Sequence, residues 1–98
     1  MSNYKIKQLQ FEKAKKLLVE IKPSTRKNKK IDVFKLGKKI ASIGGVYPSG
    51  KFYGDYATYI QNEGLEVANK KRKSYRARHD SEQKKIGSPG FYSWYILW

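Results

Sequence analysis

Seven of the eight residues in one short segment, residues 91–98, are apolar or aromatic, and the segment reads FYSWYILW. A domain of 98 residues buries only about two thirds of the surface that its unfolded chain exposes, so its core is small. The segment is the densest apolar stretch in the chain, and a stable fold must therefore use much of it. The preceding loop GSPG, residues 87–90, permits a tight reversal of the chain.

This aromatic segment has two interpretations that the sequence leaves open. In the first it is core: Gly90 allows the reversal, and Phe91 and Trp94 cover a sheet or a helix. In the second it is an interface. If Phe91 and Trp94 face inward, the remaining rings cannot all do so as well; these are Tyr92, Tyr95 and Trp98. We expect residues 90–98 to act first as a latch on the domain's own core, with the outward tyrosines as anchors for a neighbour.

The N-terminal half contains signals for a helix, a strand and a hairpin. Residues 8–18 have apolar side chains at helical spacing, with lysines such as Lys13 outward, and predict a short amphipathic helix. Alternation over residues 19–22 predicts a short strand that runs into a polar loop. Two runs of β-branched residues on either side of Gly37 predict a β-hairpin over about residues 29–45.

The C-terminal half is predicted to be mainly helical. Asp55 is placed to cap a short helix that breaks at Gly64, and a longer basic helix follows over about residues 65–79. Residues 81–90 are predicted to be a loop, and eight apolar-rich residues after it cannot distinguish a helical turn from a strand. The order of elements predicts a single compact α+β domain over residues 1–98, with a small antiparallel sheet or hairpin flanked by short helices.

Positive charge is the chain's second strong property. The formal net charge is +14, which implies attraction to polyanions or to acidic protein surfaces. Six cationic residues fall within residues 70–78 with one acidic residue near the start of the run, so an anionic partner would relieve their mutual repulsion. The residues expected to contact such a partner are Arg26, Lys29, Lys30, Lys70, Lys71, Arg72, Lys73, Arg76 and Arg78.

Several function classes find no support in the sequence. The chain has no cysteine and one histidine, His79, so we expect no metal site and no cofactor. No nucleophile motif and no glycine-rich phosphate loop before a helix is visible, and we expect a non-enzymatic protein. No apolar run approaches the roughly 18 residues of a membrane span. Tyr75 and His79 lie one turn apart and are expected to lock the helix end against the C-terminal aromatics.

Five short blocks, in order, resemble a family of small basic proteins of large nucleocytoplasmic DNA viruses: PSTRKNKKIDVF, GKKIASIGG, GDYATYI, YRARHD and GSPGFYSWYILW. The family pattern combines a basic hairpin, an Asp-aromatic-Thr element, a Tyr-x-x-Arg-His helix end and a C-terminal aromatic block. In this chain it falls on Ser24, Arg26, Lys29, Lys30, Asp55, Tyr56, Thr58, Tyr75, Arg78, His79, Gly90, Phe91, Leu97 and Trp98. The resemblance covers roughly residues 20–98.

The resemblance implies a viral protein, located in the virion and, during assembly, in the host cytoplasm or virus factory. We expect a minor capsid or capsid-associated structural protein that bridges larger capsid proteins through their acidic surfaces. The alternative is a sequence-independent DNA-binding protein that packages or condenses the viral genome, with cations on phosphates and tyrosines stacked on bases.

Overall fold

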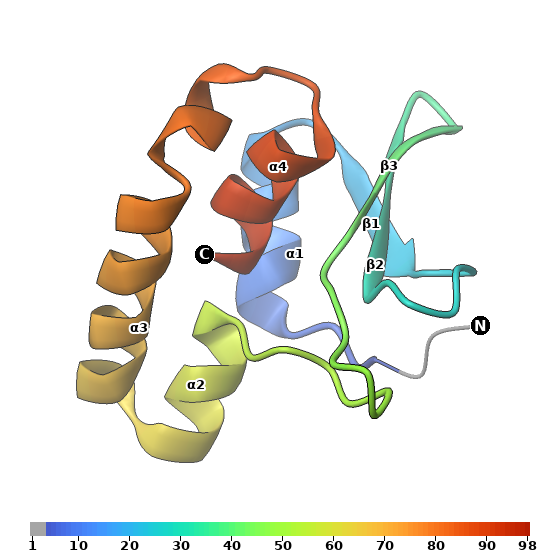
Figure 1. Ribbon diagram of the computed structural model, residues 1–98. Coiled ribbons are helices and arrows are strands. Elements are labelled where there is room, and N and C mark those ends of the chain that lie inside the picture. Colours follow the sequence, from blue (N-terminus) through green and yellow to red (C-terminus); the bar gives the residue numbers. More distant parts are fainter. Residues whose placement is uncertain (1–3) are drawn as a thin grey trace.

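A computed structural model describes residues 4–98, which form a three-stranded antiparallel sheet and a set of short helices in one globule (Figure 1). The α+β fold class predicted from the sequence is confirmed. In chain order the main elements are α1 (Gln8–Lys16), β1 (Glu20–Pro23), β2 (Ile31–Lys35), β3 (Lys38–Ile43), α2 (Tyr56–Glu63), α3 (Leu65–Arg78) and α4 (Pro89–Tyr92). A 3₁₀ turn, Asp80–Lys84, lies between α3 and α4, and a π-helical turn, Ser93–Leu97, continues α4.

The sheet is a meander in the order β1-β2-β3. Val33 at its centre lies opposite Ile21 of β1 and Ala41 of β3. The β2–β3 connection is the two-residue turn Leu36–Gly37, with φ of 52° and 79°, as required by a type I′ hairpin. The predicted hairpin is thus present, with its turn at the predicted glycine.

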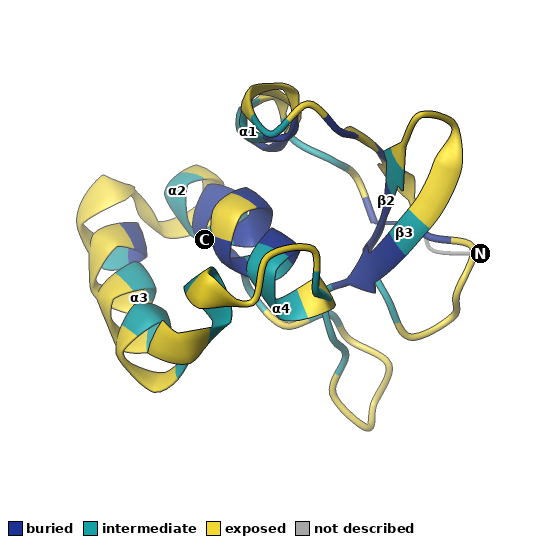
Figure 2. Ribbon diagram, turned by 90° about the horizontal axis from the view of Figure 1, so that it is seen from above, coloured by how far each residue is buried: buried dark blue, intermediate teal, exposed yellow. Residues whose placement is uncertain are grey.

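The C-terminal aromatic segment is a central part of the core. It lies between the sheet and the α2–α3 pair, and much of it is coloured as buried, like the facing part of the sheet (Figure 2). It contributes four buried side chains, Tyr92, Trp94, Ile96 and Leu97. Ser88 caps α4 by accepting a hydrogen bond from the Phe91 amide, and Pro89 occupies the first helical turn, where its missing N–H costs nothing.

The expectation that Tyr92 faces outward is wrong. Only 6% of its surface is exposed, because α4 packs on β3 and turns this ring into the core formed with the sheet. Among the three expected interface aromatics, Tyr95 keeps 38% of its surface exposed, and Trp98 is half-buried. Phe91 is also half-buried, while Trp94 is fully inside.

Helix α1 is rotated relative to the predicted amphipathic face. Phe11 is 44% exposed and Lys13 is half-buried, so the expectation that Lys13 points outward is wrong. The cause is Gln10, which is fully buried and donates a hydrogen bond of 2.8 Å to the Tyr4 hydroxyl. Tyr4 in turn donates to the Asp55 carboxylate at 2.6 Å. This polar network fixes which side of α1 faces inward.

Candidate functional site

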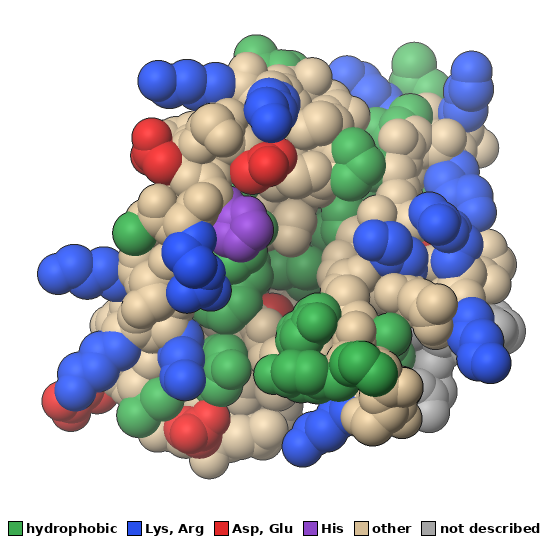
Figure 3. Space-filling model, in the orientation of Figure 1, with side chains coloured by type: hydrophobic (Ala, Val, Ile, Leu, Met, Phe, Trp, Pro, Cys, Tyr) green, Lys and Arg blue, Asp and Glu red, His purple; other side chains and the backbone are tan. Residues whose placement is uncertain are grey.

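A cleft of about 760 Å³ opens between α3 and the hairpin side of the molecule (Figure 3). Its lining comes from segments far apart in sequence: residues 29–30, residues 42–45, three residues of the following loop (Tyr47, Tyr53 and Gly54), Tyr59 of α2, α3 with the turn that follows it, and the C-terminal segment. Figure 3 shows the hollow beside His79, drawn in purple, with lysines and arginines on both sides of it. The volume lies within the range of about 300–1,000 Å³ that is typical of ligand pockets.

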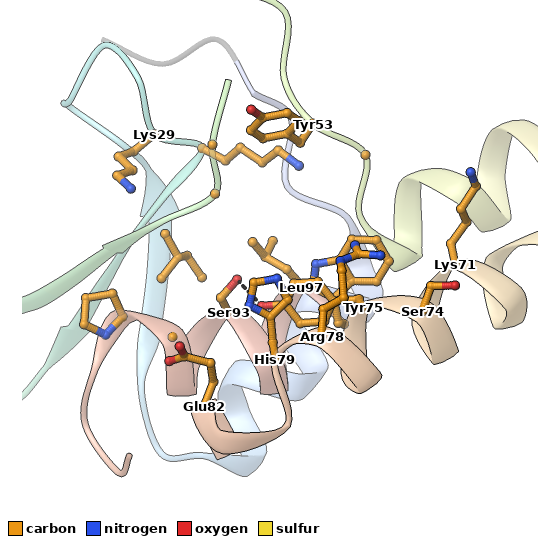
Figure 4. Close-up of a pocket in the computed structure, with 18 of the residues that line it drawn as sticks. Lys29, Tyr53, Lys71, Ser74, Tyr75, Arg78, His79, Glu82, Ser93 and Leu97 are labelled. Carbon is orange, nitrogen blue, oxygen red and sulfur yellow. Dashed lines mark hydrogen bonds between the residues drawn. The ribbon is translucent and has the colours of Figure 1, made fainter. Parts of the chain in front are cut away.

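The floor of the cleft is a stack of three rings. Tyr75 of α3 lies between His79 and Trp98, with ring centroids 4.3 Å and 4.6 Å away and interplanar angles of 21° and 9°. The Tyr75 hydroxyl donates to Ser93 Oγ at 3.3 Å, the dashed line in Figure 4. Burial raises the pKa of Tyr75, so its hydroxyl stays neutral. The end of α3 is thereby held against the C-terminal aromatics.

Two glycines bring the walls close to this floor. A Cβ at Gly54 would lie 2.5 Å from the Tyr59 ring, so only glycine lets that ring pack against the backbone. Tyr59 then tilts against Trp98, with centroids 6.1 Å apart. At Gly90, a Cβ would meet the Glu82 carboxylate, so the Glu82 side chain rests directly on the backbone of this reversal.

Three of the expected cationic residues face each other across the cleft. Lys29 comes from the loop before β2, and Lys71 and Arg78 come from α3 on the opposite side (Figure 4). Lys71 Nζ also lies 5.5 Å from the centroid of the Tyr59 ring. Glu82 is the acidic residue in the cleft lining, and its carboxylate lies 3.8 Å from Lys85 Nζ. The cleft is therefore predominantly positive.

The expectation that Lys30 contacts an external anion is wrong. The residue is 1% exposed, and its Nζ forms an ion pair of 2.8 Å with Asp55, the N-cap of α2. Burial lowers the pKa of Lys30, and the lysine charge holds the pKa of Asp55 below its usual value despite the burial of the carboxylate. Gly44 accommodates the lysine stem, since a Cβ there would lie 2.7 Å from Lys30 Cγ.

Arg72 and Arg76 also point inward rather than to an open surface. The Arg72 guanidinium lies 3.4 Å from the centroid of the Tyr56 ring, and that of Arg76 lies 5.2 Å from the centroid of the Trp94 ring. Arg76 donates to the Trp98 carbonyl at 3.4 Å. The Nε atoms of both arginines are buried without a hydrogen-bond partner. Both residues therefore pack the inner face of α3.

The remaining expected contacts lie elsewhere on the surface. Arg26, Lys70 and Lys73 are exposed and are not among the residues that line the cleft. Within residues 4–98, no cluster of three or more His, Cys, Asp or Glu side chains could hold a metal ion. In the same range, no helix combines the length and the apolar character needed to cross a bilayer.

Sequence reasoning missed the tyrosines at the mouth of the cleft. Tyr47 and Tyr53 line it and remain 47% and 45% exposed, with ring centroids 4.2 Å apart. The signal was the segment VYPSGKFYGDY, in which tyrosines alternate with turn-forming residues and have no obvious core partner. The cleft as a whole combines positive charge with flat ring faces, the two features that bind an anionic polymer carrying aromatic groups.

Comparison with known proteins gives no relative for this chain: no family model, no curated protein and no solved structure matches it. The resemblance to a viral family therefore stays a prediction. The cleft lining includes eight of the residues on which that pattern falls: Lys29, Lys30, Tyr75, Arg78, His79, Gly90, Leu97 and Trp98.

Proposed function

We propose that the protein binds nucleic acid without sequence specificity, through the cleft between α3 and the hairpin side. The observation that carries the proposal is the placement of Lys29 opposite Lys71 and Arg78, above a floor of aromatic rings. Cations on both walls can contact successive phosphates of one backbone. The cleft offers few side chains for reading base edges, so affinity should come from phosphate contacts.

The first test compares two triple charge reversals. One changes Lys29, Lys71 and Arg78 to Glu, and the other changes three exposed lysines outside the cleft, Lys16, Lys35 and Lys38. Both variants have the same net charge, so any difference reports position rather than total charge. Binding of a labelled DNA strand is measured by fluorescence anisotropy over a series of salt concentrations.

The cleft variant should bind far more weakly than the control variant. Its slope of log affinity against log salt should be shallower by about 2, because each lost single-strand phosphate contact removes roughly 0.7. Equal losses in the two variants would show that only total charge matters. Polyglutamate serves as a competitor: if it displaces the DNA at equal charge concentration, the cleft recognises acidic protein surfaces instead.

A second candidate function is the capsid-associated role expected from the resemblance, and one observation favours it. Leu18 and Leu36 are the non-glycine residues with positive φ in the described chain, at 59° and 52°, and they are 82% and 100% exposed. Leucine at such positions is costly for the fold, since the conformation favours glycine or asparagine and the side chain gains no burial. A contact with a larger shell protein would bury these two side chains and so account for leucine at both positions.

The substitution Leu36→Asn tests this second candidate. Asparagine suits the type I′ turn, so the variant should fold at least as stably as the original chain. If Leu36 contacts a shell protein, the variant should be depleted from DNA-free shells of purified virus particles while its binding to DNA is unchanged. Unchanged particle content, or partition of the protein entirely with the released genome, would eliminate the structural role.

A further inference from the structure

The exposed tyrosines at the mouth of the cleft are held in place by the backbone around them. The Val46–Phe52 bridge and a hydrogen bond of 2.8 Å from Tyr47 N to Lys51 O close the loop. The Tyr53 amide donates to the Gly45 carbonyl at 3.0 Å. A Cβ at Gly45 would lie 2.9 Å from the Tyr53 ring, so glycine lets this ring lie on the backbone. One flat ring is thus fixed at the cleft while 45% of the residue stays exposed.

The opposite wall presents a second ring in a fixed orientation. His79 is half-buried, and one face of its imidazole is covered by Tyr75. Trp98 stacks on the other face of Tyr75, so the packing of both neighbours restricts the orientation of the imidazole. Figure 4 shows Tyr53 and Lys29 on one side of the cavity and His79 and Arg78 on the other, with open space between them. A planar group that entered from the mouth would meet rings from both walls.

The shape of the cleft favours a single strand over a duplex. Its volume of about 760 Å³ is suited to a small group, whereas base pairs in a duplex are stacked on each other and expose only their edges. A single strand has unstacked bases whose faces are available to aromatic side chains, whatever their identity. Lys29 and Arg78 line the same cleft from opposite walls, as contacts with the phosphates on either side of an inserted base would require.

We propose that the cleft binds single-stranded nucleic acid by taking an unstacked base between Tyr53 and the His79–Tyr75–Trp98 ring stack, with the adjoining phosphates on Lys29 and Arg78. This inference rests on the proposed nucleic-acid binding and adds the form of nucleic acid and the residues that contact the base.

The experiment uses the full chain, three labelled probes and one unlabelled competitor at one salt concentration. The probes are an oligothymidine, an oligonucleotide of the same length and charge whose central nucleotides are abasic, and a duplex of the same length. The competitor is free thymidine monophosphate. Tyr53→Leu removes the aromatic face but keeps an apolar group over Gly45, and Tyr53→Phe keeps the ring. Tyr95→Leu is the matched control, an exposed tyrosine that does not line the cleft.

The oligothymidine should bind about 5- to 150-fold more tightly than the abasic strand, which is the usual range for stacking on one aromatic side chain. Tyr53→Leu should remove most of this difference while leaving abasic binding unchanged. Tyr53→Phe and Tyr95→Leu should behave like the original chain.

Equal affinity for the normal and abasic strands, or tighter binding of the duplex, would overturn the base-insertion inference. Either result would leave the proposed phosphate binding intact, provided that charge reversal at Lys29, Lys71 and Arg78 still lowered the affinity for every probe. Absence of binding to every probe would overturn the proposed function itself. Displacement of the strand by stoichiometric thymidine monophosphate would also overturn the inference, because it would indicate a site for a free nucleotide.

Discussion

Tyr75 and Trp98 stack almost in parallel, with ring centroids 4.6 Å apart and an interplanar angle of 9°. The contact joins the last turn of α3 to the C-terminal segment, 23 positions later in the sequence. A hydrogen bond from Tyr75 to Ser93 lies on the same side of the helix. The floor of the cleft and the core of the domain are therefore parts of one assembly, and changes to the aromatic segment should affect both.

Deletion of residues 91–98 should abolish cooperative folding. The deletion removes four buried side chains, and truncation of a single buried Phe or Trp typically costs about 3–5 kcal/mol against a total stability of about 5–15 kcal/mol. Thermal unfolding followed by near-ultraviolet circular dichroism checks the expectation. Tyr95→Ala is the control and should cost far less, about 1 kcal/mol, because the side chain is 38% exposed and its ring contact is with Phe91. A sharp, unshifted transition in the truncated chain would show that the segment is only an external anchor.

Removal of one partner of the Lys30–Asp55 ion pair should be strongly destabilising. Lys30→Met leaves a carboxylate that is 0% exposed without its cation, a change that costs about 3–5 kcal/mol. The double variant Lys30→Met, Asp55→Asn should lose less than the sum of the single changes, because the uncompensated charge is gone while the acceptor for Tyr4 remains. Urea unfolding measures the free energy of unfolding of the two single variants and the double variant.

The neighbouring substitution Lys29→Met is the matched control for that pair. Lys29 is half-buried at the cleft and has no ion pair among the described residues, so stability should change by only about 0.5 kcal/mol. The affinity for nucleic acid should show the opposite order: Lys29→Met should weaken binding more than Lys30→Met does. If Lys30→Met were as stable as Lys29→Met, the buried ion pair would be energetically unimportant.

Local signals account for the parts of the fold that were predicted. Gly37 marks the hairpin turn, Asp55 accepts the hydrogen bond from Thr58 N that begins α2, and Gly64 separates α2 from α3 with a φ of 92°. Each of these residues acts within a few positions of itself, so the sequence alone is informative. The predicted helix ends differ from the observed ones by only one or two residues at α1 and α3.

Side-chain direction could not be predicted where a distant partner decides it. Lys29 and Lys30 are adjacent lysines, yet Lys29 faces the cleft and Lys30 is buried. The ion pair with Asp55 holds Lys30 inside, and Asp55 lies 25 positions away in the sequence, too far for a local pattern to reveal the pair. Tyr92 and Tyr95 likewise differ only through the packing of α4 on the sheet. The cleft itself is built from separate segments, and no spacing within one of them could reveal it.

Acid should destabilise the protein through Asp32. Burial alone would raise the pKa of this carboxyl, but hydrogen bonds from Ser24, Ser42 and the Thr25 amide outweigh it and lower the pKa to about 2. The folded state therefore binds the proton less readily than the unfolded state. Its stabilisation is complete above pH of about 5 and is lost as the pH falls toward about 2.

The variant Asp32→Asn isolates this contribution. At pH 7 it should lower the free energy of unfolding by about 1–3 kcal/mol, because hydrogen bonds to a charged acceptor are replaced by weaker ones. The difference from the original chain should shrink as the pH falls, and it should be small near pH 2. Urea unfolding at a series of pH values measures it. A difference that is independent of pH would mean that the carboxylate charge is not involved.

Lys13 should titrate well below an ordinary lysine. Burial, followed by repulsion from Arg72 and Arg76, lowers its pKa to about 8. Since the folded pKa lies below the unfolded value of 10.5, protonated Lys13 opposes folding. This penalty is fully present below pH 8 and disappears as the pH rises toward 10.5, so Lys13→Met should stabilise the protein at pH 7 and lose that advantage in alkaline solution.

Nuclear magnetic resonance of the lysine side chains over pH 6–11 measures the Lys13 pKa directly. Arg76→Met should raise this pKa, because it removes one of the two positive charges that repel the protonated amine. Arg78→Met, on the same helix but in the cleft wall, is the control and should leave it unchanged. A Lys13 pKa that stays near 8 in the Arg76 variant would show that Arg76 does not contribute to the shift, and would leave burial and the Arg72 charge as its causes.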